Sequence, residues 1–146
     1  MPSRLLIILV TVTLGTLPFG CFPKRYDPAR GTVPYPRELG RGETVAVQVT
    51  RDGDTMHIVN GTAIGFRDFD LWLNQRYLHH VESLPPGGRI SIGMNEFWDM
   101  WGGGPNPGGL LRWYDPTPIV LVEAQIDEES PLIGFISILE SDELER

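Results

Sequence analysis

Apolar and polar residues alternate in two neighbouring runs near the middle of the chain, residues 44–51 and 54–59. A period of two residues is typical of a β-strand with one buried face. Asp52-Gly53 between the runs is typical of a two-residue type I′ turn, which predicts a hairpin that pairs Val49 with Met56. Directly opposed residues share a face of the sheet. The predicted buried face consists of Val47, Val49, Met56 and Ile58.

A second hairpin is predicted over residues 70–81, with its turn at Asn74-Gln75, because Asn tolerates the left-handed backbone of a tight turn. This turn pairs Trp72 with Tyr77 as an aromatic cross-strand pair. No segment has a long helical period, so short strands at close spacing predict an all-β domain, a β-sandwich of seven or eight strands. Further strands are expected over residues 89–94, 118–126 and 132–139.

Part of this pattern resembles a known family of domains. The run Leu71–Leu78 is followed by the turn Leu84-Pro-Pro-Gly87 and by the alternating strand Ile90–Ile92. Immunoglobulin-like accessory domains of bacterial envelope proteins carry a similar hairpin with an Asn turn, then a Leu-Pro-Pro-Gly turn and an alternating strand. The resemblance implies an immunoglobulin-like β-sandwich. It implies no site residues, because a fold does not determine a function.

Residues 1–20 have the layout of a secretory signal peptide. A short start with the basic residue Arg4 is followed by an apolar run over residues 5–14 and a small, turn-prone exit over residues 15–20. The apolar run is shorter than the roughly 20 residues that span a bilayer. We therefore expect residues 1–20 to direct export. The alternatives are an uncleaved anchor over residues 5–19 and a buried N-terminal strand or helix.

Cys21, the single cysteine of the chain, directly follows Gly20 at the end of this leader. A cysteine at that place resembles the signal of bacterial lipoproteins, in which it is lipidated and becomes the first mature residue. The resemblance implies that a membrane is a partner through an N-terminal lipid on Cys21. That signal usually has Leu, Val or Ile where this chain has Pro18. The alternative is therefore an ordinary secreted or periplasmic soluble protein with a free thiol.

The segment after Cys21 is rich in proline, which favours an extended and semi-rigid chain. Residues 21–42 are therefore predicted to be the lipidation cysteine and a tether in front of a β-sandwich domain over residues 43–146. The alternative is a segment that lies across the surface of the domain or supplies an edge strand. Asn60-Gly61-Thr62 matches an N-glycosylation sequon, but after a bacterial-type leader we interpret it as a turn.

The charge of the chain bears on its partners. The net charge is −7, and the basic residues are scattered singly. Binding to nucleic acid needs clustered Lys and Arg against the phosphates, so we expect no nucleic-acid partner.

Residues that carry chemistry in other proteins show no established spacing here. His79 and His80 are neighbours, and neighbours on a strand point to opposite faces, so with His57 they do not form a ligand set. Asp68 and Asp70 lie on the same side of an extended segment and could act as paired carboxylates or bind calcium, but this spacing often arises by chance. No nucleophile elbow, phosphate-binding loop or zinc-protease motif occurs in the sequence. We expect no catalytic residue, no metal site and no cofactor.

Aromatic residues flank a glycine- and proline-rich loop over residues 102–109. Trp and Tyr offer rigid contact area with a polar group, which suits recognition of a protein or a sugar. The alternative is that they pack beneath the loop and hold it. The loop itself buries no apolar area and is costly to order, so it is predicted to be mobile. The candidate binding residues are Trp98, Trp101, Trp113 and Tyr114.

Together these features predict an exported, lipid-anchored cell-envelope protein. Its β-sandwich is expected to be a non-enzymatic interaction or structural module, with an envelope protein or a glycan as partner. Two alternatives stay open. One is an exported hydrolase whose site is assembled only by the fold, and the other is a carbohydrate-binding module that uses the tryptophans beside the loop.

Overall fold

The computed structural model describes residues 25–106 and 115–139. Over these residues the protein is all-β, as the sequence predicts, and none of its helices is long and apolar enough to cross a membrane. The leader, Cys21, Trp113 and Tyr114 lie outside the described residues. The strands are β1 (Arg41–Asp52), β2 (Thr55–Asn60), β3 (Phe66–Leu73), β4 (Tyr77–Leu84), β5 (Arg89–Gly93), β6 (Val122–Gln125) and β7 (Leu132–Ser137), and the short 3-10 helices are η1 (Pro28–Arg30), η2 (Arg37–Leu39) and η3 (Met94–Glu96).

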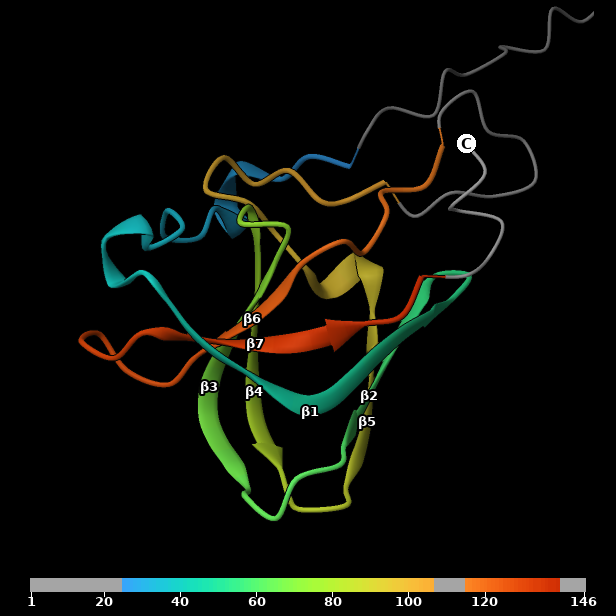
Figure 1. The fold of residues 1–146 in the computed structure, drawn as a ribbon. Helices are drawn as coiled ribbons and strands as arrows, with labels where there is room; N and C mark the ends of the chain where they lie inside the picture. Colours follow the sequence, from blue (N-terminus) through green and yellow to red (C-terminus); the bar gives the residue numbers. More distant parts are fainter. Residues whose placement is uncertain (1–24, 107–114, 140–146) are drawn as a thin grey trace, which may run out of the picture.

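The seven strands form one mixed sheet in the order β4-β3-β6-β7-β1-β2-β5 (Figure 1). All neighbours are antiparallel except β1 and β7. The edge strands β4 and β5 follow each other in the chain across the short turn at residues 85–88. Since so short a turn brings the two edges together, the sheet has to curl. At the other end of the curl, Leu78 of β4 and Trp98 exchange backbone hydrogen bonds of 2.8 and 3.1 Å. The sheet is therefore nearly closed.

Strand β1 joins the two parts of this sheet. It pairs with β7 from Arg41 opposite Leu132 to Val49 opposite Ser137, and with β2 from Val47 opposite Asn60 to Asp52 opposite Thr55. The strands β1 and β7 approach so closely that a Cβ added at Gly134 would lie 2.7 Å from the Thr44 Oγ1 atom. Any larger residue at this point of the parallel pair would therefore require the Thr44 side chain to shift.

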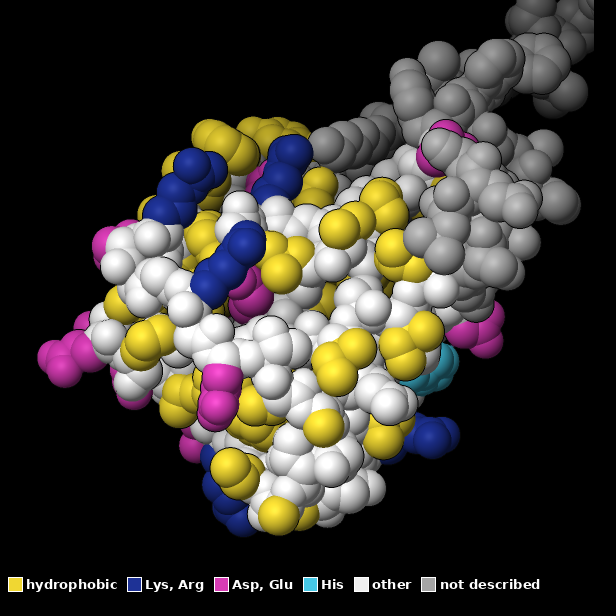
Figure 2. All heavy atoms as spheres, in the orientation of Figure 1, with side chains coloured by type: hydrophobic (Ala, Val, Ile, Leu, Met, Phe, Trp, Pro, Cys, Tyr) yellow, Lys and Arg dark blue, Asp and Glu magenta, His cyan; other side chains and the backbone are white. Residues whose placement is uncertain are grey.

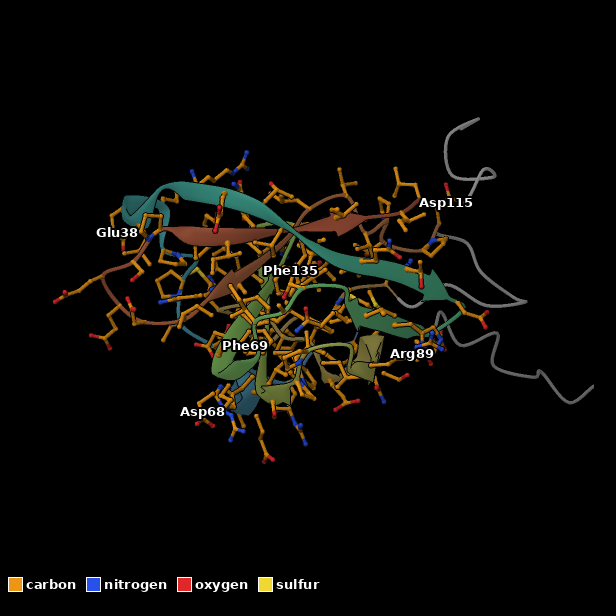
Figure 3. All side chains as sticks on the ribbon, turned by 60° about the horizontal axis from the view of Figure 1, so that its bottom comes forward. Glu38, Asp68, Phe69, Arg89, Asp115 and Phe135 are labelled. Atoms are coloured by element: carbon orange, nitrogen blue, oxygen red, sulfur yellow. The ribbon has the colours of Figure 1, made fainter. Side chains whose placement is uncertain are left out.

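The core fills the inside of the curl, and every strand contributes to it. The rings of Phe66, Phe69 and Phe135 form a group at its centre, with centroids 5.6 to 6.3 Å apart. Figure 3 shows Phe69 and Phe135 in the interior, whereas Asp68 and Arg89 point outward. Val47, Val49, Met56 and Ile58 are fully buried, so the predicted core face of the first hairpin is confirmed.

The register of the first hairpin differs from the prediction. Val49 lies opposite Ile58, two positions from the predicted partner Met56. The loop residues are Gly53 and Asp54, and Gly53 takes a φ of +54°, as glycine does at the first position of a type II′ turn. A shift of two residues leaves every side chain on its predicted face, because side chains alternate with a period of two. The pattern of burial therefore identified the face but not the register.

The second hairpin is shifted by one residue. Leu73 pairs with Tyr77 across a three-residue loop, so Trp72 lies opposite Leu78 and the predicted Trp72–Tyr77 pair is wrong. The cause is Asn74, whose side chain is engaged by a distant segment. Its Nδ2 donates to the Pro118 carbonyl at 2.6 Å, and its Oδ1 accepts from two backbone N–H groups, those of Val120 and Leu121. Tyr77 therefore faces the core and Trp72 the outer side of the sheet.

Asn60 ends β2 as a fully buried polar residue. Its Nδ2 donates to the carbonyl oxygens of Ile64, Leu84 and Pro85, at 2.7, 3.3 and 3.1 Å. Its Oδ1 accepts from the N–H and the hydroxyl of Thr62. The Asn60-Gly61-Thr62 segment is thus a turn, as predicted, and the Asn60 side chain ties it to the connection between β4 and β5.

We predict that Asn60→Ala lowers the free energy of unfolding by about 2 to 3 kcal/mol, because it leaves buried carbonyl groups without donors. Chemical denaturation measures this change. Asn95→Ala is the matched control, since Asn95 is exposed, and its effect should stay within about 0.5 kcal/mol. Equal effects of the two substitutions would contradict the role given to Asn60.

Candidate functional site

Two segments that are far apart in the sequence lie side by side on the sheet, residues 25–33 and residues 98–104. They are the blue and gold segments along the top of Figure 1. Backbone hydrogen bonds join them: the N–H of Asp27 donates to the Gly102 carbonyl at 2.7 Å, and that of Gly104 donates to the Arg25 carbonyl at 3.2 Å. The start of the described chain is therefore fixed to the loop that carries Trp98 and Trp101.

Asp99 holds this arrangement together. Its carboxylate is buried and accepts two hydrogen bonds from the Arg76 guanidinium, at 3.0 and 2.7 Å. It also accepts from the backbone N–H groups of Trp101, at 3.0 Å, and Gly103, at 2.6 Å. Gly102 between them has a φ of +80°, and a Cβ there would lie 2.0 Å from the Asp27 carbonyl oxygen. The loop thus has one conformation, set by a carboxylate and a glycine.

These contacts decide the charge state of Asp99. Burial by itself would raise the pKa of the carboxyl group, but the hydrogen bonds from Arg76 and from the two backbone N–H groups lower it below its ordinary value. The hydrogen bonds between Arg76 and Asp99 also raise the pKa of Arg76. The site therefore holds a stable ion pair with the carboxylate on the inner side.

Trp98 packs beneath the surface. Its side chain is 8% exposed, and the Cζ atoms of Arg25 and Arg30 lie 3.5 and 5.2 Å from its ring centroid. Arginines this close to an indole face are attracted by the ring. The pKa of Arg25 is lowered, first by burial and then by the neighbouring Arg30 cation. Its Nη1 is buried and has no hydrogen-bond partner among the described residues.

Trp101, in contrast, is held outward. It is 61% exposed, and Tyr26 and Met100 beside it are 66% and 43% exposed. Tyr26 and Trp101 line a small hollow of about 150 Å³, and Arg25, Arg30 and Trp98 line a broader one of about 690 Å³. We call the surface formed by Arg25, Tyr26, Arg30, Met100 and Trp101 the aromatic face.

The structure thus separates the predicted binding residues. Trp98 has the packing role, Trp101 is available for binding, and Trp113 and Tyr114 lie outside the described residues. The prediction of a mobile loop is wrong for residues 102–104, which are buried and hydrogen-bonded. The loop does not have to bury apolar area of its own, because Asp99 and residues 25–33 supply its partners.

Sequence reasoning missed the residues that build this site, Arg25, Arg76 and Asp99. Asp99 had a detectable signal, since an Asp followed by glycines is typical of a loop in which the carboxylate accepts backbone N–H bonds. The sequence around Arg25 and Arg76 contains no comparable signal. Their roles depend on segments that only the fold brings together.

Residues 33–40, expected to belong to a tether, also pack on the sheet. The Tyr35 ring meets Trp72 edge-to-face, with centroids 5.4 Å apart, and its hydroxyl donates to the buried Glu123 carboxylate at 2.7 Å. Burial, and then this hydrogen bond, raise the pKa of Tyr35. Arg41 forms an ion pair with Glu123 at 3.0 Å. From Arg25 onward the segment lies across the domain, the alternative that its proline content left open.

His57 and His80 lie outside both hollows, whereas His79 lines the broader one beside Glu96. His57 Nδ1 is 2.8 Å from the Ser91 hydroxyl oxygen, and His80 Nδ1 is 2.9 Å from the Asp70 carboxylate, each pair directly opposed on neighbouring strands. Within residues 25–106 and 115–139, no three His, Cys, Asp or Glu side chains meet in a way that holds a metal ion.

Comparisons of this chain with models of protein families, with curated proteins and with solved structures give no match.

We predict that Asp99→Asn lowers the free energy of unfolding by about 2 to 3 kcal/mol at neutral pH, because Arg76 loses its charged partner. The folded pKa of Asp99 lies below its unfolded value of about 3.9, so this stabilisation is present above that value and is lost as the pH falls through the folded pKa. Denaturation at several pH values checks this.

The difference between the wild type and Asp99→Asn should therefore shrink below about pH 4. The control is Asp68→Asn, at an exposed residue with a φ of +46° that Asn also tolerates. A difference for Asp99→Asn that is unchanged at low pH would show that the charge of Asp99 does not stabilise the loop.

Proposed function

We propose that the protein is an exported cell-envelope lipoprotein whose domain is a non-enzymatic module for binding or structural contact. The observation that carries the module is the aromatic face, where the buried carboxylate of Asp99, paired with Arg76, accepts from the Trp101 N–H and holds this residue in an exposed position. Rigid exposed Trp and Tyr side chains are the residues that most often dominate binding surfaces. An envelope protein or a glycan is the partner class, and nucleic acid is not, since the chain is acidic.

The export and attachment rest on the sequence. Residues 1–20 have the order of a signal peptide, and Cys21 stands where bacterial lipoproteins are lipidated.

The proposal includes an immunoglobulin-like topology. Two parts of the sheet support it: β4-β3-β6-β7 and β1-β2-β5. They match the strand sets C′-C-F-G and A-B-E of that fold, with β1 to β7 as strands A, B, C, C′, E, F and G. The strand β1 joins the two sets through its parallel pairing with β7.

Lipid attachment is tested in bacteria that express the full chain in the presence of a labelled fatty acid. We expect the label on the wild type and its loss in Cys21→Ser, and a mature chain that begins at Cys21. Ser3→Ala is the control, because it changes a hydroxyl outside the cleavage site. A cytoplasmic chain with residues 1–20 intact would contradict export, and label retained in Cys21→Ser would contradict attachment at this residue.

Binding through the aromatic face is tested by the retention of the full chain on isolated cell envelopes. Without the lipid, in the Cys21→Ser background, Trp101→Ser should weaken retention by about tenfold or more, the usual size for a residue that dominates an interface. Val120→Ser is the matched control, since Val120 is 62% exposed and lies outside the aromatic face. Equal retention of the two variants would remove the face from the proposed function.

A further inference from the structure

We infer that the aromatic face lies on the headgroup layer of the membrane that holds the lipid of Cys21. This inference rests on the proposed lipid attachment and names the partner of the same surface. It follows from the position of residues 25–40, which leave no spacer between the anchor and the domain.

The length of the chain limits where the domain can sit. From Cys21 to Arg25 there are four Cα–Cα steps of about 3.8 Å, so the two residues are at most about 15 Å apart. Arg25 is fixed to the domain through its carbonyl, which accepts from Gly104, and through its guanidinium on Trp98. A domain of this size has a radius of gyration of about 13 Å. A link this short cannot reach around it, so the end that carries Arg25 faces the bilayer.

The side chains at this end suit the interface between water and lipid. Tyr26 and Trp101 are largely exposed, and these two residue types are enriched at the headgroup level of membranes because a ring and a polar group share one side chain. Met100, next to Trp101 in the sequence, adds an exposed apolar side chain. Figure 2 shows hydrophobic side chains in yellow beside basic side chains in dark blue along this upper edge of the molecule.

The two aspartates at this face are each paired with an arginine, although the chain as a whole carries −7. Asp99 is buried against Arg76, and Asp27 lies 3.6 Å from Arg30. Arg25 forms no ion pair of this kind among the described residues, so the face carries a small excess of positive charge. Lipid phosphates are strong acceptors for such a guanidinium.

The positions of the other acidic residues also favour an orientation of the aromatic face toward the bilayer, with Glu96 as the one exception. Glu96 lines the broader hollow, where its Oε1 accepts from the Gly93 N–H. The acidic β6–β7 loop at Asp127, Glu128 and Glu129 lies well apart from the face (Figure 1). An anionic bilayer repels that loop more than it repels the aromatic face.

The test uses the purified, lipid-bearing full chain in vesicles of phosphatidylcholine and phosphatidylglycerol with brominated acyl chains. Bromine quenches tryptophan fluorescence only in contact or close to it. Trp72 and Trp98 are buried in the domain, so the difference between the wild type and Trp101→Phe isolates the signal of Trp101. We expect brominated lipid to quench this signal and Trp101→Phe to lose that quenching. Acrylamide in the water should quench Trp101 in detergent but not in vesicles.

Each outcome decides the inference. A Trp101 signal that brominated lipid leaves unchanged and acrylamide quenches equally in vesicles and detergent overturns it, and the face is then open to an envelope protein or a glycan. Mass measurement of the same sample reports on the lipid separately. If the chain carries no lipid, the proposed attachment fails. The unlipidated chain is then added to the same vesicles, where quenching of Trp101 supports a membrane-binding face and its absence overturns it.

Discussion

The aromatic face depends on the hydrogen bonds that the buried carboxylate of Asp99 accepts. A carboxylate inside a protein is stable only when its oxygens are satisfied, and here Arg76 and the backbone of the loop supply every bond. Because the donors come from Arg76, directly before β4, and from the loop, the carboxylate fixes the loop relative to the sheet. The loop in turn supplies the backbone partners of residues 25–33. One ionised group thus places both segments of the aromatic face.

A second buried carboxylate has a parallel role on the outer side of the sheet. Glu123 of β6 receives Tyr35 from the N-terminal segment and Arg41 from β1, while the Tyr35 ring covers Trp72. The segment before β1 is therefore attached through the hydrogen bond of Tyr35 and the ion pair of Arg41 with Glu123, rather than through a large buried apolar area. This explains how a stretch with four prolines and little apolar periodicity becomes part of a folded domain.

Local patterns predicted the all-β class, the buried face of the first hairpin and the turn at Asn60, because each depends on residues that are close in the sequence. They failed where distant residues decide the outcome. The Asn74 turn gains a residue because its side chain binds residues 118–121, and the proline-rich segment packs because Glu123 and Asp99 receive it. Trp101 was one of the candidate binding residues predicted from the sequence, and it is exposed. The ion pair that holds it in this position joins Arg76 and Asp99. No local pattern reports such a pair.

The parallel pairing of β1 with β7 has a consequence for the time course of folding. Synthesis delivers the chain from its N-terminus, and β7 follows β1 by about a whole domain length. Until residues 132–137 emerge, β1 has a partner only along its second half, and residues 41–46 present unpaired backbone groups. The fold is therefore complete only after β7 has been synthesised. Before that point, a chaperone that covers the unpaired backbone of residues 41–46 would protect the chain from aggregation.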